Sequence, residues 1–192
     1  MRDVLDIHTH TLISGHAYNT IMEMAHAALE KGLELLGITD HAPEMPGGPH
    51  RFYFDNLKVM PREIDGMPLL FGTEINICDF EGKLDLPEST LQKLDVVIAS
   101  LHIPCIKPGS REENTQAIVA ALKNPYVNII GHPDDGRYPV DMEQIVYTAK
   151  EEHKLLELNN HSLDPSGTRQ GARENDIQML KYCVEYQQPI IM

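Results

Sequence analysis

The sequence predicts an α/β fold in which strands alternate with helices around a parallel sheet. Short apolar runs rich in Val, Ile and Leu are separated by amphipathic stretches of helical period, which is the pattern of successive strand–helix units. The 192 residues fit one domain, and no linker or internal repeat divides them. We therefore expect a single domain over residues 1–192.

The expected strands cover residues 4–10, 35–39, 69–77, 96–100, 127–131, 155–159 and 189–192. Thr20 and Glu23 form a capping box at the start of the first expected helix, and Gly32 is placed to end it. Asp141 and Gln144 are placed in the same way before another helix. Further helices are expected over residues 115–123 and 173–186. The loops over residues 42–55 and 104–113 are long enough to shape a pocket.

Composition restricts the classes of function. The formal net charge of −13 argues against a nucleic-acid surface, which works through clustered Lys and Arg, so no nucleic-acid partner is expected. The start of the chain lacks the apolar core of a signal peptide and no run approaches a membrane span, which predicts a cytoplasmic protein without a membrane partner. Three well-separated cysteines indicate reduced thiols. Ten histidines against four phenylalanines are the one anomaly, and histidine is the commonest metal ligand.

The position of these histidines favours a metal site. His8 and His10 lie two apart near the end of an expected strand, so both imidazoles face the same side. Two packed histidines would show the same spacing, but the pattern recurs at the ends of four further expected strands. The residues at those ends are His41, Glu74, His102 and His132. In a parallel barrel these ends converge on one face, where such folds build their sites, and His16 can join from the first loop.

The chemistry of this set suits particular metals and one reaction. Imidazoles with one carboxylate favour zinc, with manganese or iron as alternatives, over calcium or magnesium. Glu74 is placed to bridge two cations. Closely spaced ions can bind a phosphate through two oxygens and activate a water near neutral pH, which indicates metal-assisted hydrolysis.

These motifs resemble the PHP (polymerase and histidinol phosphatase) superfamily over nearly the whole chain. The residues that carry the resemblance are Asp6-Ile7-His8-Thr9-His10, His16, Ile38-Thr39-Asp40-His41, Gly72-Thr73-Glu74, Ser100-Leu101-His102 and Gly131-His132-Pro133. Gly15-His16-Ala17-Tyr18, Glu74-Ile75-Asn76-Ile77 and Glu157-Leu158-Asn159-Asn160 are similar to the small bacterial YcdX-type phosphatases.

The resemblance implies a distorted TIM-like (β/α)7 barrel and a trinuclear metal site. By the family pattern His8 and His10 hold one ion, Glu74 bridges it to a second ion at His102 and His132, and His16 with His41 hold a third. The family also has an Asp-x-His pair after the last strand, and this sequence ends at Met192, so we expect the family domain without its C-terminal part. A homo-oligomer could cover the last strand.

Other polar residues are weaker candidates. His161, Arg51, Lys107, Arg137 and Arg169 fall in expected site-face loops and could bind the substrate phosphate, although solvated loop charges are common. Asp6 and Asp40 stand beside ligands and could orient imidazoles; ordinary capping explains them equally well.

The sequence thus predicts a metal-dependent phosphatase whose substrate is a small phosphomonoester and whose cofactors are up to three divalent ions. Two alternatives remain at this stage. One is a phosphodiesterase or nuclease-type hydrolase, as in other members of the superfamily. The other is an inactive metal-binding domain that lacks the Asp-x-His pair.

Overall fold

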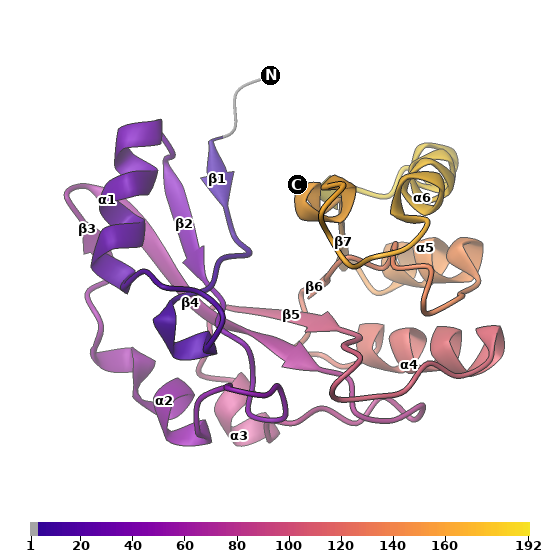
Figure 1. The fold of residues 1–192 in the computed structure, drawn as a ribbon, viewed down its shortest axis with the longest axis horizontal. Coiled ribbons are helices and arrows are strands. Elements are labelled where there is room, and N and C mark those ends of the chain that lie inside the picture. Colours follow the sequence, from indigo (N-terminus) through magenta and orange to yellow (C-terminus); the bar gives the residue numbers. More distant parts are fainter. Residues whose placement is uncertain (1–3) are drawn as a thin grey trace. The chain divides into compact units, whose positions relative to one another are not determined.

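A computed structural model describes residues 4–192, and Figure 1 shows its helices and strands. The chain forms two compact units. The first consists of the described residues up to Ile75 together with Asp85–Ile98, and the second of Asn76–Leu84 and Ala99–Met192. Strands β4 and β5 contribute residues to both units.

Parallel pairing organises the first unit. Its strands lie in the order β1 (Leu5–Asp6), β2 (Leu35–Ile38), β4 (Met67–Asn76) and β5 (Val96–Ser100). β1 pairs with β2 in parallel, and β2 pairs with β4 in parallel. Gly37 in β2 permits a close approach of the chain that follows β1, because a Cβ atom at this position would lie 2.6 Å from the carbonyl oxygen of Ile7. The absent side chain therefore helps to set where the segment after β1 runs.

The short strand β3 (Glu63–Ile64) was not expected from the sequence. It pairs antiparallel with β4 through a two-residue turn at Asp65 and Gly66, whose φ angles of 48° and 85° are both positive. An Asp-Gly pair is a strong signal for this hairpin turn. The flanking strand is only two residues long, which is why the apolar pattern did not reveal it.

Helix α1 (Ile21–Lys31) forms as the sequence predicts. The Thr20 hydroxyl accepts from the Glu23 N–H, the Glu23 carboxylate accepts from the Thr20 N–H, and Gly32 ends the helix with φ 77°. Helix α2 (Arg51–Asn56) instead occupies the end of the expected loop over residues 42–55. Its N-cap is the His50 side chain, which no capping box marks in the sequence. The smaller helical elements of this unit are η1 (Leu12–Ser14), η2 (Leu57–Val59) and α3 (Glu88–Leu91).

The second unit repeats the strand–helix pattern. After the end of β5 its strands are β6 (Ile129–Ile130), β7 (Leu155–Glu157) and β8 (Ile190–Ile191), and β7 pairs in parallel with both β6 and β8. Its helices are α4 (Arg111–Leu122), α5 (Met142–Glu151) and α6 (Ala172–Tyr186), with the short turn η3 (Asn160–Leu163). α5 packs against both α4 and α6 (Figure 1).

Helix α4 begins four residues earlier than the expected range of 115–123. Ser110 and Glu113 form a capping box, and the first turn is charged and polar, so its apolar periodicity starts late. The buried Asn114 side chain donates to the carbonyl oxygens of Gly109 and Pro139, which satisfies a polar group that sequence patterning places in a loop. The loop after β5 is shorter as a result.

Each unit has an apolar core of its own. Ile38, Phe71 and Val97 are buried in the first, and Ile130, Ile145 and Leu156 in the second. Among residues 4–192, no helix has both the length and the apolar character needed to cross a bilayer.

We expect Phe71→Ala to lower the free energy of unfolding by about 3–5 kcal/mol, because Phe71 is 1% exposed and its removal leaves a cavity. Phe52→Ala is the matched control, since that ring is 69% exposed, and its expected effect is within about 0.5 kcal/mol. Urea unfolding of both variants measures the difference. Equal losses would contradict the core assignment.

Candidate metal centre

The segment after β1 carries the first two predicted ligands. His8 and His10 direct their Nε2 atoms toward the same oxygen of Glu74, Oε2, at 3.2 and 3.3 Å. Thr9 between them is buried and points the other way, where its hydroxyl donates to the Gly37 carbonyl at 2.6 Å. This alternation along the chain is what the spacing of the two histidines predicted.

Glu74 lies in β4 and is 1% exposed. Its backbone N–H donates to the carbonyls of Thr39 and Asp40, both at 3.1 Å, which fixes the residue beside the end of β2. His41, the residue after Asp40, places its Nδ1 atom 2.9 Å from Glu74 Oε2. Three imidazole nitrogens thus surround one buried carboxylate oxygen. A neutral imidazole has one lone pair and one N–H, so such a set suits either hydrogen bonding or metal coordination.

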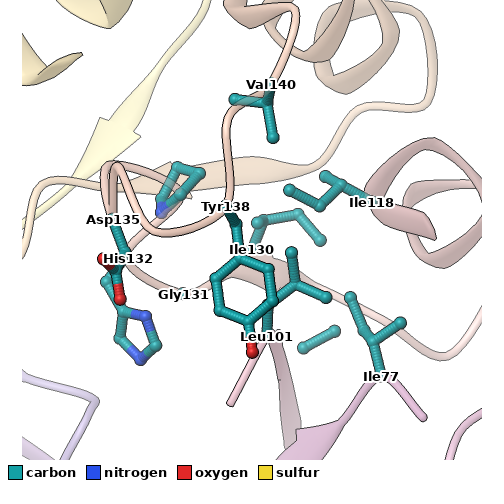
Figure 2. A pocket seen from close by; sticks show the side chains of 11 residues that line it. Ile77, Leu101, Ile118, Ile130, Gly131, His132, Asp135, Tyr138 and Val140 are labelled. Atoms are coloured by element: carbon teal, nitrogen blue, oxygen red, sulfur yellow. The ribbon is translucent and has the colours of Figure 1, made fainter. Parts of the chain in front are cut away.

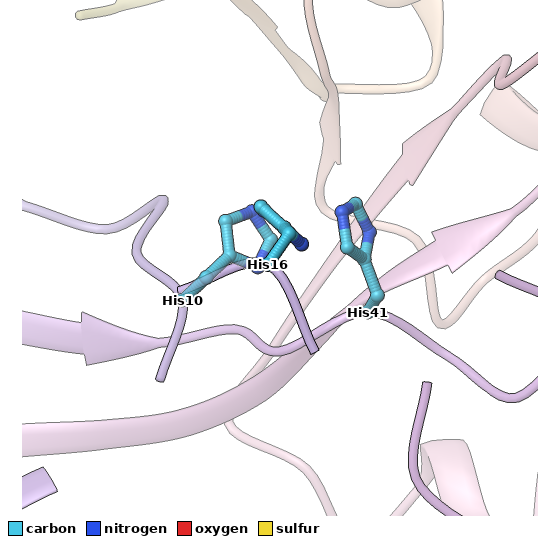
Figure 3. Close-up of side chains that lie close together, drawn as sticks. All are labelled: His10, His16 and His41. Carbon is cyan, nitrogen blue, oxygen red and sulfur yellow. The ribbon is translucent and has the colours of Figure 1, made fainter. Parts of the chain in front are cut away.

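His10, His16 and His41 form a tight group from the same unit (Figure 3). Their ring centroids are 4.4 Å apart for His10 and His41, 4.8 Å for His16 and His41, and 5.1 Å for His10 and His16. One potential ligand atom of each lies within 4.8 Å of the others. Zinc binds imidazole nitrogen at about 2.0–2.1 Å, so one ion could reach all three rings after small rotations. The donor set fits a divalent transition metal.

Asp40 and Asp6, the two acids expected beside ligands, differ in their surroundings. Asp40 is fully buried and accepts hydrogen bonds from Thr11, Ser14 and Tyr53. Asp6 lies in β1 and is exposed. Sequence reasoning missed the hydroxyl groups around Asp40, because Ser, Thr and Tyr in loops and short helices are too common to be a signal.

The second unit contains the remaining two predicted ligands. His102 places Nδ1 2.7 Å from Oδ1 of Asn76, and the His102 and His132 ring centroids lie 5.4 Å apart. His132 has φ 30°, in the left-handed region that non-glycine residues rarely adopt. The backbone N–H of His132 donates to Glu157 Oε2 at 2.8 Å. Strained residues of this kind cluster at functional sites, which agrees with a ligand role for His132.

A small cavity adjoins His132 in the second unit (Figure 2). Its volume is about 10 Å³, and the other lining side chains include Ile77, Leu101, Ile118 and Tyr138. Such a cavity holds about one water molecule. It is too small for a substrate, so the residues around it serve to pack the base of the His132 loop.

The predicted substrate contacts all have described positions. In the first unit Arg51 donates to Asp55 and Thr90. In the second, Lys107 and His161 are exposed, Arg137 forms an ion pair with Asp135 at 2.6 Å, and Arg169 donates to Ser162 at 3.0 Å. The hydrogen bond to Asp135, together with the charge of that carboxylate, raises the pKa of Arg137. These contacts hold the arginine side chains in place.

Two buried acids of the second unit were not predicted. Asp134 and Asp176 are 0% and 3% exposed, and their carboxylate oxygens have no hydrogen-bond partner among the described residues. Burial, together with the charge of Asp134, raises the pKa of Asp176 to about 7. Asp176 could not be recognised as a buried acid from the sequence, because it lies among other polar residues of α6 and its burial depends on tertiary packing.

Stability should fall as pH rises because of Asp176. The folded chain keeps a proton on this carboxyl up to about pH 7, whereas the unfolded chain loses it near the ordinary pKa of 3.8. The native state therefore binds more protons between these values, and its stability decreases across that window. Asp176→Asn should remove this dependence, so its gain in stability over the parent chain should be larger at pH 8 than at pH 5. Glu174→Gln, on the exposed surface of α6, is the control. Identical unfolding profiles for Asp176→Asn and the parent chain would refute it.

Comparisons with known proteins agree with this geometry. The family model described as "PHP domain" matches residues 6–164. A probable phosphatase of Clostridium novyi is 50% identical over 192 residues, which is all of this chain and 78% of that protein. A probable phosphatase of Caldanaerobacter subterraneus is 57% identical over 163 residues, or 84% of this chain and 64% of that protein.

A solved structure shares the fold. The crystal structure of histidinol phosphate phosphatase from Lactococcus lactis, in complex with zinc, L-histidinol and phosphate, aligns with a TM-score of 0.63 at 17% identity. The alignment covers 96% of this chain and 81% of that one. The likeness confirms the predicted α/β, TIM-like fold class.

Proposed function

Because the chain belongs to the PHP domain family and is a metal-dependent phosphatase, we propose that its substrate is a small phosphomonoester. The observation that carries the proposal is the group of three imidazole nitrogens around Oε2 of Glu74, at 2.9 to 3.3 Å. A buried carboxylate shared by several imidazoles is suited to hold divalent cations close together.

Up to three ions, with zinc first and manganese or iron as alternatives, would be held by the seven predicted ligands. In the first unit these are His8, His10, His16, His41 and Glu74, and in the second His102 and His132. When bound, such ions lower the pKa of a water molecule and neutralise charge on the phosphoryl oxygens. The chain's own contribution is to hold the imidazoles in place and to supply the negative charge that keeps the cations together.

The charge of the chain supports a small anionic substrate over a nucleic acid. Three dications, each with two positive charges, would change the formal charge from −13 to −7 and concentrate the positive charge at the ligands. A polynucleotide would meet the acidic remainder of the surface, whereas a small phosphate ester would meet the metal centre alone. A small phosphorylated molecule is therefore the proposed partner.

Substrate contacts outside the metal ligands are also proposed. Arg137 and Arg169 are held by neighbouring side chains, which would limit the rotamer entropy lost when a guanidinium binds phosphate. His161 and Lys107 are exposed and accessible to a ligand in the same unit, and Arg51 is partly so in the first.

Glu74→Gln should lower phosphatase activity by at least about 100-fold, because the variant replaces the negative carboxylate that would hold the cations with a neutral amide. The assay uses the purified chain loaded with zinc or manganese and a panel of phosphomonoesters and phosphodiesters. Glu81→Gln, at an exposed loop position, is the matched control and should keep full activity.

Circular dichroism of the variant would show whether the fold is retained. Faster cleavage of diesters than of monoesters would favour the phosphodiesterase alternative. Full activity of a folded Glu74→Gln variant would contradict the proposed metal chemistry.

A further inference from the structure

Asp40 is a fully buried carboxylate that is held by hydroxyl groups and a backbone amide. Its Oδ1 accepts from the Thr11 N–H at 2.7 Å and from the Ser14 hydroxyl at 2.7 Å. Its Oδ2 accepts from the Tyr53 hydroxyl at 2.7 Å, and the Thr11 hydroxyl approaches both oxygens. A buried charge is tolerated only when it is well hydrogen-bonded, and these donors meet that need.

The direction of the Ser14 hydroxyl follows from this arrangement. A carboxylate can only accept, so the single hydroxyl proton of Ser14 points to Asp40. The Ser14 hydroxyl oxygen also accepts a hydrogen bond from the backbone N–H of His41 at 3.0 Å. Toward its third neighbour, Nδ1 of His10 at 3.4 Å, Ser14 therefore has only a lone pair to offer.

That constraint bears on which His10 nitrogen carries the proton. A neutral imidazole whose Nδ1 faces an acceptor keeps its proton there and leaves the lone pair on Nε2. Nε2 of His10 lies 3.3 Å from Glu74 Oε2, which also only accepts, so in the metal-free chain the two sides compete for the ring proton. A cation between Nε2 and Glu74 would remove this competition, and the Ser14 lone pair would then support the proton on Nδ1. His16 is treated in the same way, because its Nδ1 faces the Ser14 carbonyl oxygen at 3.3 Å and a carbonyl also only accepts.

We propose that Asp40, Ser14 and Tyr53 are positioning residues that fix His10 in the tautomer able to bind metal through Nε2. The proposal rests on the proposed metal-dependent function and deepens it. Asp40 orients the Ser14 hydroxyl, Ser14 orients the His10 ring, and Tyr53 holds the Asp40 carboxylate from helix α2.

Tyr53 is suited to this role because it stays a donor. Burial first, and then the charge of Asp40, raises the pKa of its hydroxyl far above the ordinary value. The Tyr53 proton consequently remains on the phenol throughout the pH range in which the chain folds. The hydroxyl groups of Tyr53 and Thr11 donate to Oδ2 of Asp40. Oδ1 of Asp40 is thereby left for the Ser14 hydroxyl and the Thr11 backbone N–H.

Asp40→Ala tests the orientation directly. The variant removes the acceptor of the Ser14 proton, so the hydroxyl can turn toward Nδ1 of His10 and favour the Nε2–H tautomer. Nitrogen-15 NMR of the metal-free chain at pH 8 distinguishes the two tautomers. We expect a larger share of Nε2–H at His10 in the variant than in the parent chain, with zinc affinity lowered about 10–100-fold.

Ser14 provides a second test that does not disturb a buried charge. Ser14→Ala should lower zinc affinity and raise the share of Nε2–H at metal-free His10, because the acceptor beside Nδ1 is lost. Ser14→Thr keeps a hydroxyl and should restore both the affinity and the tautomer ratio. Tyr53→Phe should give a smaller loss than Asp40→Ala. The matched controls are Tyr147→Phe and Asp164→Ala, both exposed in the second unit, and they should leave zinc affinity unchanged.

Zinc affinity is measured by competition with a chromophoric chelator. Unchanged affinity and an unchanged ratio of Nδ1–H to Nε2–H in both Asp40→Ala and Ser14→Ala would overturn the inference. A parent chain that binds no zinc would instead refute the proposed function. The change in the tautomer ratio of metal-free His10 between the parent chain and the two variants would still decide whether Ser14 orients the ring.

Discussion

The first unit depends on one buried negative charge, the carboxylate of Glu74. It is 1% exposed, and three imidazole nitrogens approach one of its oxygens. Burial of a carboxylate is costly unless the charge is compensated, so the surrounding strand ends must present groups that can compensate it. Parallel pairing of β1, β2 and β4 achieves this, because predicted ligands separated by more than sixty residues in the sequence meet at one edge of the sheet.

A second buried charge, on Asp40, organises the loop that carries predicted ligands. Its donors come from the segment after β1 and from α2, so the hydrogen bonds connect two parts of the unit around the residue before His41. The same hydrogen bonds hold the Ser14 hydroxyl beside Nδ1 of His10, one of the predicted ligands. Preorganisation of this type is how proteins limit the ordering that metal binding would otherwise require.

The sequence predicted more of the chemistry than of the local structure. The alternation of apolar runs gave the fold class, and the positions of His8, His10, His41 and Glu74 at strand ends gave their proximity, because both depend on simple periodicity. Helix α2 and strand β3 were missed, since a side-chain cap at His50 and a two-residue strand leave no periodic signal. The partners of Asp40 and the burial of Asp134 and Asp176 depend on contacts between distant segments, which no local pattern encodes.

Anomalous scattering from crystals of this chain grown with zinc would decide whether Glu74 belongs to a metal centre, because it locates ions without reference to turnover. We expect a zinc peak at about 2 Å from imidazole nitrogens of the first unit, with Glu74 among the ligands. Zinc peaks confined to surface residues, with no density within coordination distance of Glu74, would contradict it.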